Sequence, residues 1–177
     1  MADYVLAHGL DAASLRPLAK AAGTSDRMLL YYFADKNALI TAILDHIAAR
    51  LTVLMVAQGV ADPVPFDACL ARTAGILGNA MFAPYMRLFL QIASLAGQND
   101  SLYRAIGENL GRMYFAWAQG QLDSRDDAAR DHEAAMLIQR IEGMVFLRAI
   151  GLEDINRLAF GQTALPDVQT DAGLQPQ

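Results

Sequence analysis

The amino-acid sequence predicts an all-α protein, in which a small N-terminal unit of short helices precedes a larger helical region. Apolar residues recur with helical spacing along most of the 177-residue chain, and no strand-like alternation of any length is present. Hydrophobic residues make up 54% of the chain, which is enough for a sizeable core and too many for global disorder.

Residues 1–8 predict a short helix that ends at Gly9. The next helix is expected to begin after Ser14, a residue suited to cap it, and to end before Gly23, whose backbone freedom permits a sharp turn. Its buried stripe follows the i, i+3, i+4, i+7 spacing. The members of this stripe are Leu15, Leu18, Ala19 and Ala22.

A further short helix follows this turn, with Ser25 as its cap and with Leu29 and Phe33 buried one turn apart. Asp35 is expected to cap a long helix that begins at Lys36. Two short helices joined by a glycine-containing turn are the helix-turn-helix pattern of DNA-binding proteins. The residues expected on its exposed side are Asp26, Arg27, Leu30 and Tyr31.

This stretch resembles the DNA-binding domain of the tetracycline-repressor (TetR) family. The residues that carry the resemblance lie within roughly residues 9–44 and are Leu18-Ala19, Ala22-Gly23-Thr24-Ser25, Leu29 to Phe33, Asp35-Lys36 and Leu39. The resemblance implies an N-terminal three-helix helix-turn-helix DNA-binding domain plus a C-terminal helical ligand-binding and dimerisation domain. It also implies a longer first helix than residues 1–8, so this helix is expected to be truncated.

Carried over to this chain, the family pattern implies a set of DNA contacts. Base or groove contacts fall to Arg16, Asp26, Arg27, Met28 and Leu30, and phosphate contacts fall to Ser14, Thr24, Ser25, Tyr31, Tyr32 and Lys36. Arginine can make a bidentate contact with guanine. The net charge of the chain is −5, but residues 14–36 hold four basic and two acidic side chains, a balance that permits DNA binding.

The long helix is expected to run from Lys36 to about Ala57, where the prolines of the 62–65 segment break the chain. Later helices are predicted over 66–79, 84–96, 101–121, 124–150 and 153–160. We expect a DNA-binding domain over 1–46, an effector-binding and dimerisation domain over 47–160, and a flexible tail over 161–177.

The second half of the 124–150 helix, MLIQRIEGMVFLRAI, is apolar around most of its circumference and therefore needs cover on more than one face. With no further long helix in the chain, a second subunit is the expected cover. The residues expected at this interface are Leu137, Ile141, Met144, Val145 and Arg148.

Methionine and aromatic residues gather in the C-terminal region and predict an apolar ligand pocket, with ordinary core packing as the alternative. The resemblance favours a pocket because family members bind small effectors in this region. The expected lining residues are Phe82, Tyr85, Met86, Phe89, Tyr103, Met113, Tyr114 and Trp117.

A charge-dense segment supplies Asp127, Asp131, His132 and Glu133, whose spacing allows a metal site or an acid–base pair but is also typical of a solvated helix start. We favour the solvated start, and so predict no enzyme, metal or cofactor. The single cysteine, Cys69, excludes an intrachain disulfide and is expected in the core.

No uninterrupted apolar run approaches the ~20 residues that span a bilayer, and no signal peptide is recognisable, so a cytoplasmic protein without a membrane partner is expected. The sequence predicts a homodimeric transcriptional repressor that a small apolar or amphipathic effector releases from a palindromic DNA operator. Two alternatives stay open: a ligand-binding or interaction dimer of this fold with weak or lost DNA binding, and a small helical enzyme that uses the Asp127–Glu133 cluster.

Overall fold

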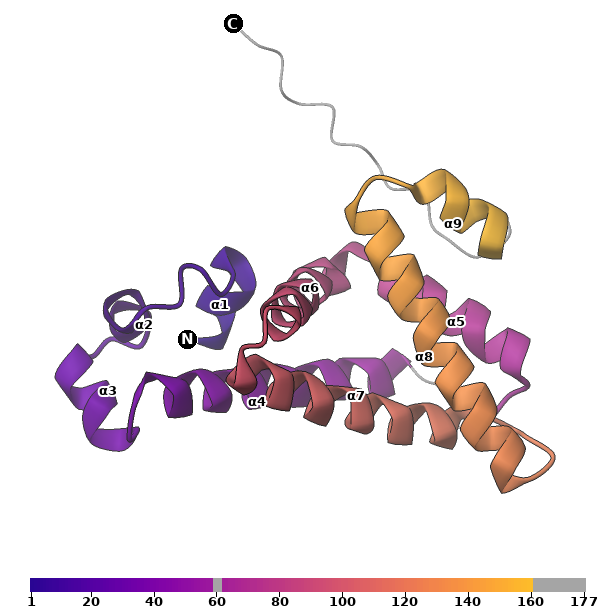
Figure 1. The fold of residues 1–177 in the computed structure, drawn as a ribbon, viewed down its shortest axis with the longest axis horizontal. Helices are drawn as coiled ribbons and strands as arrows, with labels where there is room; N and C mark the ends of the chain where they lie inside the picture. The colour runs from indigo at the N-terminus through magenta and orange to yellow at the C-terminus, as the bar shows by residue number, and fades with distance from the viewer. Residues whose placement is uncertain (59–61, 161–177) are drawn as a thin grey trace, which may run out of the picture.

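The computed structural model describes residues 1–58 and 62–160, whose secondary structure is helical apart from one isolated β-bridge between Val64 and Leu122. The helices, in chain order, are α1 (Ala2–His8), α2 (Leu15–Ala21), α3 (Asp26–Tyr32), α4 (Lys36–Gln58), α5 (Phe66–Gly78), the 3-10 turn η1 (Ala80–Phe82), α6 (Ala83–Gly97), α7 (Ser101–Gln121), α8 (Asp127–Ala149) and α9 (Glu153–Phe160) (Figure 1). The predicted all-α fold class is confirmed. The tail expected over 161–177 lies outside the described residues.

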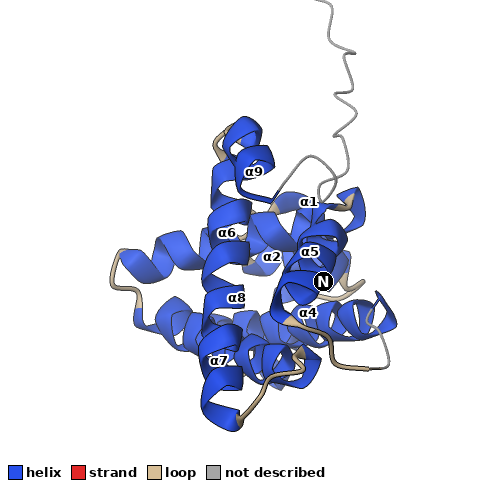
Figure 2. Cartoon of the chain, turned by 90° about the vertical axis from the view of Figure 1, so that its right-hand side faces the viewer, coloured by secondary structure: helices blue, strands red, loops and turns tan. Residues whose placement is uncertain are grey.

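The helices form one elongated arrangement in which α2 and α3 lie at one end and α5, α8 and α9 lie at the other (Figure 1). Helix α1 lies against both α4 and α6, and α6 packs on α7. Helix α8 contacts α5, α7 and α9, and Figure 2 shows it between α7 and α9. The helix-turn-helix end is therefore joined to the rest of the chain through α1, α4 and α6.

Helix α4 is the longest connection between the two ends. Its buried residues recur every three or four positions and are Leu39, Ile40, Ile43, Leu44, Ile47, Ala48, Leu51 and Met55. Although Asp45 and Arg50 interrupt it, α4 has a mean hydropathy of 1.8 over 18 residues and is long and apolar enough to cross a membrane. The predicted absence of an uninterrupted apolar run of ~20 residues still holds, and α4 passes only by its length and average composition, a test that the core helix of a water-soluble protein also passes.

Aspartate side chains cap both α7 and α8. Helix α7 begins at the predicted residue 101, and α8 begins three residues later than the predicted residue 124. Helix α7 is capped by Asp100, whose carboxylate accepts hydrogen bonds from the backbone N–H groups of Leu102 and Tyr103. Helix α8 begins at Asp127, because Asp126 accepts from the N–H of Ala129 at 2.7 Å. In each case a carboxylate, rather than the nearby serine hydroxyl, satisfies the free N–H groups of the first turn.

The expected dimer-interface residues of α8 face the core of their own chain. Leu137 and Met144 are each 2% exposed, and Ile141 and Val145 are also buried. Arg148 donates a hydrogen bond to the carbonyl of Gly78 at 2.9 Å. The interface expectation is wrong for the four apolar residues, because α5, α7 and the short α9 together supply the cover that was assigned to a second subunit.

Helix α9 is held to α8 by a buried polar contact that the sequence pattern did not indicate. Asn156 is 2% exposed, and its Nδ2 donates to the carbonyl of Met144 at 2.9 Å. The contact docks α9 against the apolar half of α8.

Candidate nucleic-acid interface and ligand cavity

The helix-turn-helix forms where the sequence predicts it. Gly23 has a φ of +66° in the turn between α2 and α3, a left-handed conformation that glycine adopts without steric cost. Ser25 accepts from the N–H of Met28 at 3.3 Å, and Asp35 accepts from the N–H of Ala38 at 2.8 Å. Both predicted caps are therefore confirmed, and they set where α3 and α4 begin.

Three expectations in this unit need correction. Ser14 precedes α2 in an extended conformation, but its side chain makes no capping hydrogen bond. Ala22 is exposed instead of completing the buried stripe of Leu18 and Ala19. Phe33 is half-buried and lies just beyond the last residue of α3, so Leu29 alone anchors α3 in the core. Helices α2 and α3 have 7 residues each, so only about one turn of each helix carries buried side chains.

All residues that the family pattern implies as DNA contacts lie on exposed surface of this unit. They are Ser14, Arg16, Thr24, Ser25, Asp26, Arg27, Met28, Leu30, Tyr31, Tyr32 and Lys36. Tyr31 and Tyr32 are 79% and 72% exposed, and their rings meet edge to face with centroids 5.3 Å apart. Aromatic side chains this exposed at the end of a helix are available for contacts with another molecule.

The charges of the unit are free to meet an anion. Arg16, Lys20, Arg27 and Lys36 are all exposed, and within residues 1–58 and 62–160 none of them forms an ion pair. The carboxylate of Asp35 caps α4 by accepting a hydrogen bond from the N–H of Ala38. The surface therefore presents unpaired cations beside tyrosine hydroxyls, the groups that contact DNA phosphates.

Residues 5–43 match the family model described as bacterial regulatory proteins, tetR family. The chain carries a tetR-family domain. The match runs from α1 through the first turns of α4 and includes every residue of the exposed set above, and it supports a DNA-binding transcriptional regulator. No curated protein matches the chain.

The tetR-family domain is tied to the following helices at two points. Arg50 of α4 pairs with Asp3 of α1 at 2.6 Å, and the Arg50 guanidinium lowers the pKa of the Asp3 carboxyl. After α1, the N–H of Leu10 donates to Oε1 of Gln91 in α6 at 3.0 Å. The position of α1 therefore depends on both α4 and α6.

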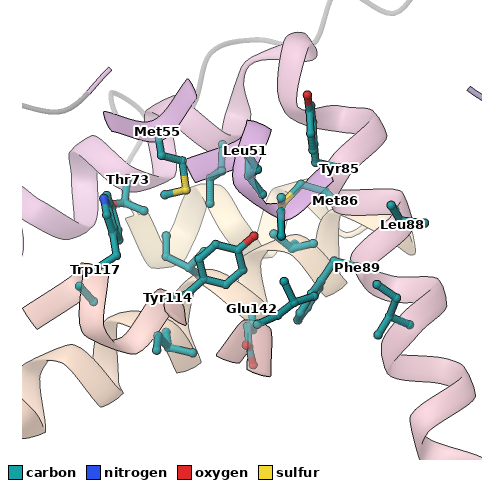
Figure 3. Close-up of a pocket in the computed structure, with 18 of the residues that line it drawn as sticks. Leu51, Met55, Thr73, Tyr85, Met86, Leu88, Phe89, Tyr114, Trp117 and Glu142 are labelled. Atoms are coloured by element: carbon teal, nitrogen blue, oxygen red, sulfur yellow. The ribbon is translucent and has the colours of Figure 1, made fainter. Parts of the chain in front are cut away.

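A cavity of about 100 Å³ lies behind α4, with walls from α4, α5, α6, α7 and α8 (Figure 3). Of the aromatic and methionine residues expected in a pocket, Tyr85, Met86, Phe89, Tyr114 and Trp117 line it. The other three do not line this cavity. Phe82 is 1% exposed and closed in the core, and Tyr103 and Met113 lie elsewhere on α7.

Most of the remaining wall was not anticipated from the sequence. It consists of Leu44, Ile47, Ala48, Leu51, Met55, Thr73, Leu77, Leu88, Ile92, Leu110, Ala118, Leu137, Ile138, Ile141, Glu142 and Val145. Aliphatic residues at helical spacing look the same whether they meet another side chain or a cavity, so no sequence signal separated them from ordinary core. Glu142 did carry a signal, as an acidic residue inside the apolar half of α8.

The polar groups of the cavity are few. The Thr73 hydroxyl is buried without a hydrogen-bond partner among the described residues, and burial raises the pKa of the Tyr114 hydroxyl. Glu142 stands at the edge of the cavity, where burial against apolar neighbours raises the pKa of its carboxyl. Figure 3 shows the ring of Tyr114 in the middle of the group, with Met55 and Trp117 on one side.

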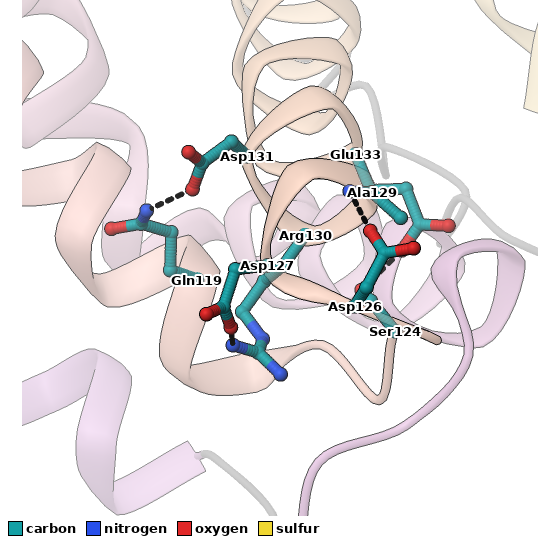
Figure 4. Close-up of polar contacts among 8 residues, drawn as sticks. All are labelled: Gln119, Ser124, Asp126, Asp127, Ala129, Arg130, Asp131 and Glu133. Atoms are coloured by element: carbon teal, nitrogen blue, oxygen red, sulfur yellow. Dashed lines mark hydrogen bonds and ion pairs between the residues drawn. The ribbon is translucent and has the colours of Figure 1, made fainter.

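The acidic cluster at the start of α8 is a set of helix-start contacts (Figure 4). Asp127 pairs with Arg130 at 2.6 Å, Asp131 accepts from Nε2 of Gln119 at 2.6 Å, and Glu133 accepts from the Ser124 hydroxyl. His132 is exposed. The carboxylates thus hold the junction of α7 and α8, and nothing in the described ranges gathers three or more His, Cys, Asp or Glu side chains for a metal.

Proposed function

We propose that this protein is a homodimeric transcriptional repressor that a small effector releases from a palindromic DNA operator. The DNA-binding domain is residues 1–46, and the effector-binding and dimerisation domain is residues 47–160. One observation carries the proposal: α4 begins directly behind the exposed helix-turn-helix and, some two turns later, forms a wall of the cavity. The two sites share one rigid element.

On the DNA, α3 lies in the major groove with its first residues toward the bases. Arg27 reaches guanine O6 and N7, a contact worth about 1–3 kcal/mol of discrimination. Tyr31, Tyr32 and Lys36 contact phosphates, which position the domain without reading sequence. The unpaired state of the cations in the free protein supports this, since no internal ion pair has to break on binding.

An effector acts by favouring one arrangement of α4 and α6 over another. Leu44, Leu51 and Met55 of α4 line the cavity, and so do residues of α6 on either side of Gln91. A ligand that fits one arrangement better shifts α4 directly and shifts α1 through the Gln91–Leu10 hydrogen bond. A coupling of about 1–3 kcal/mol between two sites is typical and lowers operator affinity five- to 150-fold.

A second copy of the chain covers the apolar surface that the described residues leave exposed at the end of α8 and on α9. Leu158 is 86% exposed, and Phe146 and Ile150 are each 54% exposed. Together with Ile155, which is 42% exposed, they are exposed apolar side chains on two helices in contact, and a two-fold symmetric partner would bury them. Such a dimer presents two helix-turn-helix units to a palindromic site in the cytoplasm.

A band-shift titration with the DNA that flanks the protein's own gene tests the proposal at stated salt concentrations, because phosphate contacts make affinity salt-dependent. We expect the full-length protein to bind this DNA and not a scrambled sequence. Arg27→Ala should weaken specific binding by roughly tenfold or more. The matched control is Arg125→Ala, an exposed arginine between α7 and α8 that lies outside both the DNA-binding surface and the proposed dimer face.

The outcome also separates the proposal from a dimer of the same fold that binds ligands only. Equal binding of flanking and scrambled DNA by the folded dimer, with no change in Arg27→Ala, would contradict the repressor function. Binding that weakens equally in Arg27→Ala and Arg125→Ala would show a non-specific charge effect and would contradict α3 as the reading element.

A further inference from the structure

The cavity behind α4 has a single charged residue in its walls, Glu142 of α8. All its other lining residues are aliphatic, aromatic or methionine side chains, apart from the hydroxyl of Thr73. In Figure 3 Glu142 lies at the lower edge of the group of lining side chains, with its carboxylate directed away from the ring of Tyr114. An apolar cavity with one acidic group at its edge suits a ligand with an apolar body and one polar end.

No described residue compensates the charge of Glu142. Neither an ion pair nor a hydrogen bond within residues 1–58 and 62–160 engages its carboxylate. One turn away along α8 its neighbours are Ile138 and Phe146, which offer no donor. Glu142 is an exposed residue at the edge of the cavity, so its carboxylate is solvated and open to a cation, and a cation placed beside it gains a charge-assisted contact at the mouth of the cavity.

Thr73 supplies a second, independent sign of a ligand. Its side chain is 2% exposed and lines the cavity, and its hydroxyl has no hydrogen-bond partner among the described residues. The Cys69 thiol lies close enough to Thr73 to interact with its hydroxyl, but a thiol is a weak hydrogen-bond partner and leaves the hydroxyl able to bind a stronger one. Buried hydroxyls in folded proteins are almost always hydrogen-bonded, so an unpaired one in a cavity marks a place for a polar atom of a ligand.

We propose that the effector is a lipophilic amine, whose protonated nitrogen pairs with Glu142 and whose apolar body lies against Met55, Phe89 and Trp117. The Thr73 hydroxyl meets a polar atom at the opposite part of the ligand. This inference rests on the proposed function in one respect, because it treats the cavity as the effector site. Binding of the amine itself is measured without DNA. Selectivity comes from charge: the same apolar body with a negative end is repelled.

A matched set of three ligands with one chain length tests the charge preference: octylamine, octanol and octanoate. Trp117 is the only tryptophan of the chain and lines the cavity, so its fluorescence reports occupancy of this site. We expect octylamine to bind the full-length protein about tenfold more tightly than octanol, the scale of one charge-assisted hydrogen bond. Octanoate should bind more weakly than octanol.

Variants then assign the preference to one residue. In Glu142→Gln the advantage of octylamine over octanol should fall to less than about threefold, with octanol affinity unchanged, since the amide keeps the shape and removes the charge. The control is Glu153→Gln, on α9 and outside the cavity walls, which should keep the full tenfold advantage.

Each result decides the inference separately from the repressor function. Equal binding of octylamine and octanol to the unaltered protein, or no binding of any of the three, would overturn it, and so would an advantage that survives Glu142→Gln. If Glu142→Gln fails to fold, the order of the three ligands on the unaltered protein still decides. A protein that shows the amine preference but no specific DNA binding would retain this inference and lose the proposed function.

Discussion

At the scale of single residues, the cavity combines two side chains that lower the stability of the free protein. Thr73 leaves a buried hydroxyl unpaired, and Glu142 places a carboxylate against apolar walls. Groups of this kind persist in proteins chiefly where a ligand or a reaction uses them. The same features that favour a ligand with a polar end therefore make the empty protein less stable than an all-apolar core would.

The pH dependence of stability should reveal Glu142. Burial raises its pKa in the folded protein, so folding becomes less favourable as pH rises through the ordinary glutamate range toward the raised value. Replacing Glu142 with Gln removes an ionisation that opposes folding. We expect Glu142→Gln to melt at a higher temperature than the unaltered protein at about pH 7, and the difference to shrink at about pH 4.

Thermal unfolding followed by circular dichroism at both pH values measures this difference. Glu153→Gln serves as the control, because no cavity wall surrounds its carboxyl. A melting temperature for Glu142→Gln that is lower at neutral pH would mean that the carboxylate is stabilised by a partner, contrary to the present account.

At the scale of elements, the caps of the short helices differ in a way that mutation can test. Ser25 accepts from the N–H of Met28, whereas Ser14 precedes α2 without a capping hydrogen bond from its side chain. We expect Ser25→Ala to lower the free energy of unfolding by about 1 kcal/mol and Ser14→Ala to change it by less than about 0.5 kcal/mol. Urea denaturation of both variants provides the comparison.

The two variants would contradict this account if they lost the same stability. Ser14 would then also cap its helix in solution, and α2 would start with a hydrogen bond that the structure lacks. The result bears on DNA binding too, since Ser25 and Ser14 lie in the surface expected to contact phosphates.

The junction between α1 and α6 depends on a glycine. Gly9 has φ +78° and ψ 178°, a region that only glycine adopts readily, and a Cβ there would lie 2.8 Å from Nε2 of Gln91. We expect Gly9→Ala to lower the free energy of unfolding by about 2–3 kcal/mol, because it adds backbone strain and displaces the Gln91 amide from Leu10.

Gly23→Ala is the matched variant. It also places a side chain at positive φ, but no atom lies within 4 Å of the added Cβ, so only about 1 kcal/mol of backbone strain is expected. Equal losses in the two variants, measured by thermal or urea unfolding, would show that the Gln91 contact adds nothing to the junction.

At the scale of the whole molecule, the surface available for dimerisation differs from the one that the sequence indicated. The apolar residues first expected at the interface are buried within the chain, and the exposed apolar face lies on the end of α8 and on α9. A symmetric homodimer buries the same patch on both copies, so one charged substitution on this face puts two like charges into the interface.

We therefore expect Leu158→Asp to convert the dimer to a folded monomer. Leu158 is 86% exposed, so its replacement removes no core contact. Leu137→Asp, by contrast, buries an unpaired charge at a position that is 2% exposed and should prevent folding. Analytical ultracentrifugation with circular dichroism distinguishes the two outcomes, and a Leu158→Asp protein that stays dimeric would place the interface elsewhere.

Local patterns in the sequence were sufficient for the secondary structure. Helical spacing of apolar residues, the caps Ser25 and Asp35 and the turn glycine Gly23 act over a few residues, so each can be read without knowing its tertiary neighbours. The helix-turn-helix follows from the same local signals, and the family match over residues 5–43 confirms the unit, whereas the residues expected to contact DNA came from the family resemblance.

Only the tertiary structure decided which apolar faces meet which. Leu137 of α8 and Leu158 of α9 are both leucines on helices, yet Leu137 is buried under the helices that contact α8, whereas Leu158 lies on a side of α9 that no described helix covers. The cavity is likewise a property of packing: Leu51, Thr73 and Glu142 come from three separate helices and have no relation along the chain. The sequence by itself determined the helices and the helix-turn-helix with its exposed residues, whereas long-range packing placed the cavity, the single carboxylate in its walls and the exposed apolar residues of α8 and α9.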